Sequence, residues 1–233
     1  MIEALDHLVI GGSAGVYETL LGRRASEGRL RTGNVGLAFT GGAPGLQSMV
    51  FATADLEKAA TLLERRAVVA TREGESLALK GHGVAIGLTA RSSEAPSPLA
   101  AEEAACVSAL DHVVVRTPNP ERAIAFYAGR LGLDLRLDRS NEKWGARLLF
   151  FRCGDLVVEI AHDLKKGVSD APDQLWGLSW RVPDVAKAQA RLKAAGLDVS
   201  PPRDGRRPGS QVFSVKDKTE GVPTLVIGGI GRW

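Results

Sequence analysis

Glu159 and His112 are the residues whose types and settings point most directly to chemistry. Glu159 is the single carboxylate in an otherwise apolar run at 157–160, which is typical of a buried strand. A buried carboxylate needs a ligand, a cation or an arginine as its partner, or it serves as a general base. His112 follows Asp111 at the start of another apolar run, where such a pair either joins a site or makes structural hydrogen bonds.

Two further strands could bring cationic and polar side chains to the same place. Side chains two apart on a strand share a face, so Arg116 is expected on the face of His112, and Arg181 on the face of Ser179. A guanidinium group binds a carboxylate through two parallel hydrogen bonds, which suits a small anionic substrate. The alternative is that Arg116 or Arg181 simply pairs with Glu159.

The loop at 201–210 carries three arginines between prolines and glycines, and it could close over an anion or remain solvated. Trp176 could flank a cleft or anchor the core. Taken together, these patterns predict a set of substrate-binding residues, namely Arg116, Ser179, Arg181, Trp176 and Arg206.

A repeated order of elements must position these residues. The string at 5–10 returns at 110–115, which indicates a tandem duplication. The second copy predicts a strand at 110–116, a helix over 121–131, and strands at 133–138, 146–152 and 156–161. The same order follows from 175, with a helix over 184–195 and strands at 198–200, 211–215 and 224–227.

The first copy predicts a shorter version of this order, with strands at 6–10, 25–30 and 33–40 and a helix over 16–21, and then a full unit over 47–88. The sequence therefore contains four βαβββ modules, of which the first has lost a strand. A stretch rich in serine and proline separates the copies. We predict an N-terminal domain at 1–91, a linker at 92–107 and a C-terminal domain at 108–230.

Over nearly its whole length, the chain resembles the vicinal oxygen chelate superfamily, which groups glyoxalase I, extradiol dioxygenases, methylmalonyl-CoA epimerase, and fosfomycin and bleomycin resistance proteins. The resemblance rests on the strand at 110–115, on Phe126 and Tyr127, on the turn at 131–133, and on the strand at 157–160. It implies an α+β fold in which tandem βαβββ modules form curved mixed sheets around a cleft.

The resemblance also implies a metal site on the first and last strands of the modules. His112 and Glu159 occupy two such positions, but the matching positions of the fourth module hold Gly177 and Leu225. In the first copy they hold His7, Gly36 or Leu37, Gln47 or Ser48, and Gly87. Two protein ligands bind a divalent ion weakly. His112 and Glu159 therefore form an incomplete set for one divalent metal (Ni, Zn, Mn, Fe or Mg), or the protein uses none.

Two functional hypotheses follow from the resemblance. The first is a lyase, isomerase or epimerase related to lactoylglutathione lyase, which acts on a small oxygenated, anionic metabolite with Glu159 as base or metal ligand and His112 as its catalytic partner. The second is a metal-free protein of the bleomycin-resistance type that sequesters a small molecule. Ring-cleaving dioxygenase chemistry is disfavoured, because Gly177 and Leu225 replace two of its three expected ligands.

The composition limits the remaining classes. The 233 residues carry a formal net charge of +3, which is too small to indicate nucleic-acid binding. No apolar run approaches the roughly 20 residues of a membrane helix. The first residues include acids where a secretory signal has bases. We therefore expect a cytoplasmic protein, either monomer or homodimer, whose partner is a small molecule.

Overall fold

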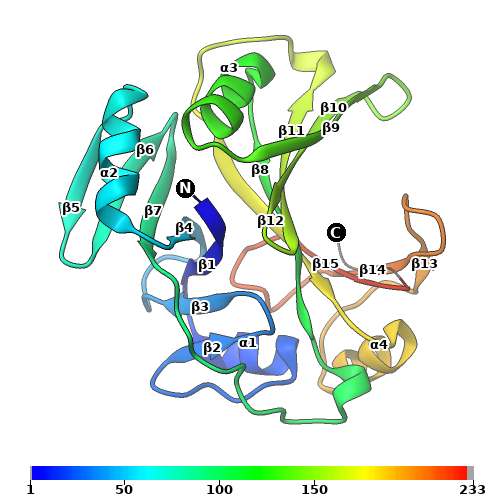
Figure 1. The fold of residues 1–233 in the computed structure, drawn as a ribbon. Coiled ribbons are helices and arrows are strands. Elements are labelled where there is room, and N and C mark those ends of the chain that lie inside the picture. Colours follow the sequence, from blue (N-terminus) through cyan, green and yellow to red (C-terminus); the bar gives the residue numbers. More distant parts are fainter. Residues whose placement is uncertain (1, 230–233) are drawn as a thin grey trace.

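One order of elements, a strand followed by a helix and further strands, recurs four times in the computed structural model, which describes residues 2–229 (Figure 1). The first two modules form a mixed sheet of seven strands, in the order β2-β3-β1-β4-β7-β6-β5. The last two form a mixed sheet of eight strands, in the order β13-β14-β15-β12-β8-β11-β10-β9. The structure confirms the predicted α+β class and the predicted loss of one strand from the first module.

The N-terminal sheet and its two helices comprise β1 (Ile2–Gly11), α1 (Ala14–Leu21), β2 (Arg29–Arg31), β3 (Gly36–Phe39), β4 (Gly45–Thr53), α2 (Leu56–Arg65), β5 (Ala70–Glu73), β6 (Ser76–Gly81) and β7 (Val84–Ala90). The strand expected at 25–30 begins only at Arg29. The preceding residues Glu27 and Gly28 have positive φ values and form a turn instead.

The C-terminal sheet and its two helices comprise β8 (Ala109–Arg116), α3 (Pro120–Ile124), β9 (Asp134–Asn141), β10 (Ala146–Cys153), β11 (Leu156–Asp163), β12 (Gln174–Arg181), α4 (Val185–Ala194), β13 (Arg203–Asp204), β14 (Gln211–Val215) and β15 (Thr224–Gly228). The helix expected over 121–131 changes to a π-helix at Ala125–Arg130. The strand expected at 198–200 is reduced to one bridge between Val199 and Val215, since Pro201 and Pro202 lack the N–H groups that a ladder needs.

Local capping defines where the helices begin. Asp55, Asn119 and Asp184 each accept a hydrogen bond from a backbone N–H of the first helical turn, and Ser13 does the same for α1. The helix expected over 184–195 thus begins directly after its N-cap residue, Asp184. Gly22, in the left-handed conformation, ends α1.

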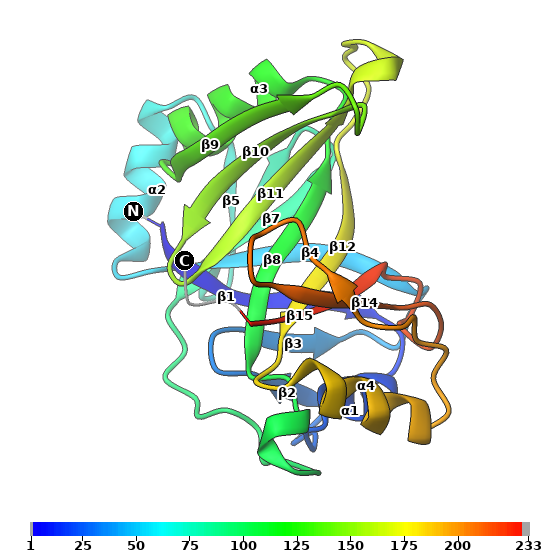
Figure 2. The same ribbon diagram turned by 90° about the vertical axis from the view of Figure 1, so that its right-hand side faces the viewer.

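The helices join the halves in pairs, with α1 and α4 at one end of the molecule and α2 and α3 towards the other (Figures 1 and 2). On α4, Arg191 Nη2 donates to the Leu20 carbonyl of α1 at 2.8 Å. Arg66, which caps α2, donates through Nη1 to the Arg130 carbonyl at 2.9 Å. The buried apolar side chains of both sheets and all four helices form one continuous core. This leaves the opposite, concave face of the C-terminal sheet available for a site.

The segment between the sheets packs against the N-terminal half. Arg23 donates to the carbonyl oxygens of Ser97 at 2.7 Å and Val107 at 2.9 Å. The division at 1–91, 92–107 and 108–230 stays a prediction, and its last residue lies outside the described part of the chain. Among residues 2–229, no helix combines the length and apolar character that a membrane span requires.

Candidate functional site

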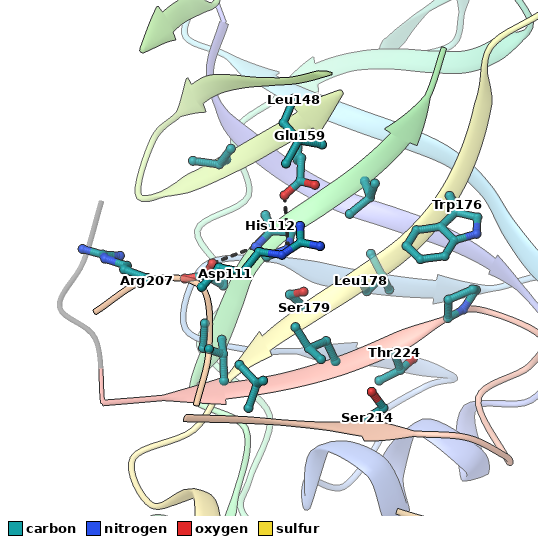
Figure 3. A pocket seen from close by; sticks show the side chains of 18 of the residues that line it. Asp111, His112, Leu148, Glu159, Trp176, Leu178, Ser179, Arg207, Ser214 and Thr224 are labelled. Carbon is teal, nitrogen blue, oxygen red and sulfur yellow. Dashed lines mark hydrogen bonds and ion pairs between the residues drawn. The ribbon is translucent and has the colours of Figure 1, made fainter. Parts of the chain in front are cut away.

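A cavity of about 1140 Å³ lies on the concave face of the C-terminal sheet (Figure 3). Residues of β8 to β12, β14 and β15 line it, together with the loop that follows β13. Its walls are largely apolar and include Leu148, Phe150 and Leu178. Ligand pockets usually measure about 300–1,000 Å³, so this cavity has room for a metabolite with several functional groups.

A bulge in β8 brings two adjacent residues to this cavity. His112 pairs with Ser179 of β12 and Leu110 pairs with Trp180, so Asp111 has no partner residue on β12. Such a bulge interrupts the alternation of faces along a strand. Asp111 therefore reaches its neighbour, and His112 Nδ1 donates to the Asp111 carboxylate at 2.8 Å. The other ring nitrogen, Nε2, is left to face the cavity.

Glu159 lies opposite that nitrogen. The strand β11 runs parallel to β8, with Glu159 level with Val114, and this register brings Glu159 Oε2 to 3.6 Å from His112 Nε2. Figure 3 shows His112 between Asp111 and Glu159. The side chains of His112 and Glu159 are 16% and 15% exposed, so most of each is shielded from water. The partner that the apolar setting of Glu159 requires is thus His112.

These contacts set the charge state of His112. Burial on its own lowers the pKa of an imidazole, because it disfavours the charged form. Here the hydrogen bond to Asp111 and the negative charges of Glu159 and Asp111 outweigh burial, and the pKa of His112 is raised above its ordinary value. The site therefore favours an imidazolium that holds one proton on each nitrogen.

Arg181 lies behind the site and not in it, in contrast to the prediction. Its Nη2 group donates to the Leu110 carbonyl at 3.0 Å and to Asp155, whose carboxylate is 3.1 Å away. Its Nε atom lies 3.8 Å from the Asp111 carboxylate. Arg181 shares the face of Ser179, but these contacts hold its guanidinium group away from the cavity lining.

The N-terminal half contributes to this support. Asn34 Nδ2 donates to the Leu110 carbonyl at 2.8 Å and to the Asp155 carboxylate at 2.9 Å. Its Oδ1 accepts the Leu110 N–H at 2.8 Å. Asn34 thus holds the residue that precedes the Asp111 bulge, and sequence reasoning missed it because no local pattern links it to β8.

The other predicted binding residues divide into two groups. Ser179, Trp176 and Arg206 line the cavity. Arg116 does not line it, because its exposed guanidinium group stacks on the ring of Trp176, 4.2 Å from the centroid. Neither Arg116 nor Arg181 pairs with Glu159.

Sequence reasoning also missed part of the cavity mouth. Arg139 of β9 and Trp144 of the turn after β9 line the cavity together with Arg206. The clustering of arginines in the 201–210 loop was a usable signal, whereas nothing local indicates that the β9–β10 turn faces that loop.

The donor set does not fit a catalytic metal site. Within residues 2–229, no three side chains of histidine, cysteine, aspartate or glutamate gather in an arrangement that could hold a metal ion. The strand register confirms Gly177 and Leu225 as the counterparts of His112 and Glu159 in the fourth module. A Cβ atom at Gly177 would lie 2.8 Å from the Pro223 carbonyl oxygen, so the backbone itself leaves no room for a metal-ligating side chain at this position.

The N-terminal sheet repeats this frame with different side chains. His7 Nδ1 contacts Asp6 at 2.9 Å, and Asp6 is again a bulge residue. The parallel register of β1 and β3 places Ala38 at the position of Glu159, which corrects the expectation of Gly36 or Leu37. The remaining counterparts are Ser48 and Gly87. A cavity of about 660 Å³ adjoins His7, but it lacks the acid that faces His112 in the C-terminal half.

Comparison with known proteins supports the assignment of the fold. Residues 109–223 match the model of the Glyoxalase/Bleomycin resistance protein/Dioxygenase superfamily. No curated protein matches the sequence. Several solved structures do share the fold over nearly the whole chain.

Three such structures illustrate the likeness. The Mn(II)-bound glyoxalase from Novosphingobium aromaticivorans has a TM-score of 0.73 at 12% identity, over 99% of this chain and 83% of that one. 2,2',3-Trihydroxybiphenyl 1,2-dioxygenase from Sphingomonas wittichii strain RW1 has a TM-score of 0.73 at 18% identity, over 100% of this chain and 92% of that one. A mutant of 4-hydroxymandelate synthase from Streptomyces coelicolor has a TM-score of 0.76 at 14% identity, over 99% of this chain and 94% of that one.

At these identities the likeness shows the fold alone. The family match over 109–223 covers the whole of the strands that carry Asp111, His112 and Glu159. The C-terminal half of the chain, residues 109–223, therefore belongs to the Glyoxalase/Bleomycin resistance protein/Dioxygenase superfamily.

Proposed function

We propose that the cavity binds a small oxygenated, anionic metabolite and that Glu159 and His112 transfer a proton at a carbon next to its carbonyl group. The alignment of Asp111, His112 and Glu159, through contacts of 2.8 and 3.6 Å, carries this proposal. A carboxylate and an imidazolium on one apolar face form an acid-base pair, which is what isomerase, epimerase and lyase chemistry requires.

In the proposed reaction, the Glu159 carboxylate takes the proton from the carbon, and the electron pair of the broken C–H bond moves toward the carbonyl oxygen. The His112 Nε2–H group donates to that oxygen and stabilises the enolate. Asp111 holds the other N–H group, so the ring keeps its orientation. Return of the proton to a different face or carbon gives an epimer or isomer, and loss of a leaving group gives a lyase product.

Sequestration without turnover, of the bleomycin-resistance type, is the second candidate function. The observation that favours it is the missing third ligand at Gly177, which separates this cavity from a complete metal site. A large apolar cavity with a polar rim suffices for binding alone.

Deuterium exchange distinguishes the two candidates. The protein is incubated in D₂O with a panel of 2-oxo acids and hydroxyketone phosphates, and NMR follows label at the carbon next to the carbonyl. We expect exchange in wild type and a loss of at least about 100-fold in Glu159→Gln, in line with the usual contribution of a general base. The control is Glu64→Gln, an exposed carboxylate on α2. Compounds that raise the melting temperature of wild type but show no exchange would support sequestration.

Metal removal provides an independent check. Because no three metal-ligating side chains gather within residues 2–229, we expect exchange to survive treatment with EDTA. We also expect melts titrated with Ni, Mn, Fe(II), Zn and Mg to be alike in wild type and Glu159→Ala. A saturable rise in melting temperature that Glu159→Ala abolishes would contradict the proposed metal-free mechanism.

A further inference from the structure

The positive charge of the chain is concentrated at the cavity. Among residues 2–229, six arginines and one lysine line it, against the two acids Asp111 and Glu159, so this lining carries a formal +5 with His112 counted as neutral. The whole chain carries +3, which leaves the rest of the molecule net negative. A low-dielectric cleft lined by one sign of charge attracts ligands of the opposite sign.

Two side chains connect the opposite edges of the eight-stranded sheet across this cavity. The strands β13 and β9 are its two outer strands. Arg206, from the loop after β13, places its guanidinium 4.2 Å from the ring centroid of Trp144, in the turn after β9. Arg139 of β9 approaches the same ring at 5.5 Å. Arg203 of β13 lines the same cavity. We call Trp144, Arg139, Arg203 and Arg206 the mouth cluster.

Neighbouring arginines form ion pairs with acidic side chains, whereas the arginines of the mouth cluster do not within the described residues. Arg136 pairs with Asp134 at 3.0 Å, and Arg147 pairs with Asp138 at 2.7 Å. Within the part of the chain that the structure describes, Arg139, Arg203 and Arg206 form no ion pair with a carboxylate. Like charges held near one ring repel each other, and an anion between them would offset that repulsion.

We propose that the mouth cluster binds a phosphate-type group of the substrate, remote from the carbon that faces Glu159. This inference rests on the proposed function and names its substrate class: an amphipathic molecule with a carbonyl in the apolar interior and a phosphorylated end at the mouth. Three guanidinium groups from two edges of the sheet present more donors than one carboxylate accepts. A phosphate group offers three acceptor oxygens and up to two negative charges.

Binding of pyrophosphate at constant ionic strength tests the proposal. Melting temperature and tryptophan fluorescence are followed in wild type, and Trp144→Phe assigns the fluorescence change. We expect saturable binding that becomes about tenfold weaker in Arg206→Gln and in Arg139→Gln. The matched control is Arg72→Gln, which removes an exposed arginine paired with Glu57 in the N-terminal half. Equal binding in wild type and in all three arginine variants would overturn the proposal.

Two further arms separate the possible outcomes. Acetate is expected to have no effect, and acetate binding as strong as that of pyrophosphate would overturn the phosphate assignment in favour of a carboxylate. Glu159→Gln is expected to bind pyrophosphate as wild type does. If wild type binds pyrophosphate but catalyses no deuterium exchange, the result counts against the proposed function. If wild type catalyses exchange but does not bind pyrophosphate, the result counts against the mouth cluster.

Discussion

His112 is held by the residue that precedes it in the sequence, and that contact links its protonation to folding. A histidine whose pKa is raised on folding stabilises the protein fully below its unfolded pKa of about 6.5, and this stabilisation is lost as pH rises through the folded pKa. We therefore expect the free energy of unfolding to fall as pH rises above about 6.5. Each unit of elevation corresponds to about 1.4 kcal/mol, measurable by urea unfolding across a pH series.

The control for this effect is His112→Gln, which cannot titrate. Its unfolding free energy should fall less over the same pH range. The unfolding free energy of Glu159→Gln should fall by an intermediate amount, because His112 keeps its hydrogen bond to Asp111 in this variant. Identical pH profiles in wild type and His112→Gln would show that His112 does not carry the effect.

The residues of the site differ in how far sequence alone can find them. Glu159 stands out because a single acid in an apolar strand must have a partner, and its partner is the histidine that the Asp-His pattern indicates. Arg181 misleads because the Leu110 carbonyl and Asp155 hold its guanidinium group. Asp111 reaches the site only through a one-residue bulge in β8. No alternating pattern in the sequence marks where such a bulge occurs.

The strand β12 is packed against a backbone carbonyl, and this contact decides what its central position can hold. A Cβ atom at Gly177 would lie 2.8 Å from the Pro223 oxygen, which is closer than any unstrained contact. We expect Gly177→Ala to lower the free energy of unfolding by about 1–3 kcal/mol, as overpacked cores do. Chemical denaturation would measure the loss.

Gly129→Ala is the matched control. Gly129 lies in the π-helix after α3, and a Cβ atom there would have no neighbour within 4 Å. Its substitution should be neutral or slightly stabilising. Equal effects of the two substitutions would mean that the backbone at Pro223 moves aside for the new Cβ atom at little cost in free energy.

The elements themselves follow the sequence closely where a hydrophobic period is strong, as in β8 and β11. The fourth module departs from it, because Pro201 and Pro202 prevent the expected strand at 198–200. In the first module the parallel register places Ala38, not Gly36 or Leu37, beside the Asp-His pair. Strand pairing depends on contacts distant in sequence, and local periodicity carries no information about them.

The two sheets are stabilised by one continuous core, so the halves should unfold together. We expect one cooperative thermal transition, with equal calorimetric and van't Hoff enthalpies. Differential scanning calorimetry tests this expectation. Two separated transitions would indicate that each half folds independently.

Asn34 tests the same coupling at one contact between the halves. Asn34→Ala leaves the Leu110 N–H without its acceptor, which should cost about 1–3 kcal/mol of unfolding free energy. Thr61→Ala, which removes one exposed hydroxyl on α2, is the comparison and should change stability little. Because Asn34 also positions Asp155 and, through it, Arg181, proton exchange should fall in Asn34→Ala as well.

The arginines at the cavity mouth have a second consequence. Within residues 2–229, β9 is an outer strand of its sheet, so one row of its backbone N–H and C=O groups has no neighbouring strand. Asp134, Arg136 and Asp138 place a charge at every second position along it. Charged edges resist pairing with a strand of another copy. The proposed ligand recognition by Arg139 and the resistance to aggregation therefore involve the same strand, and a sequence change that improves one is expected to weaken the other.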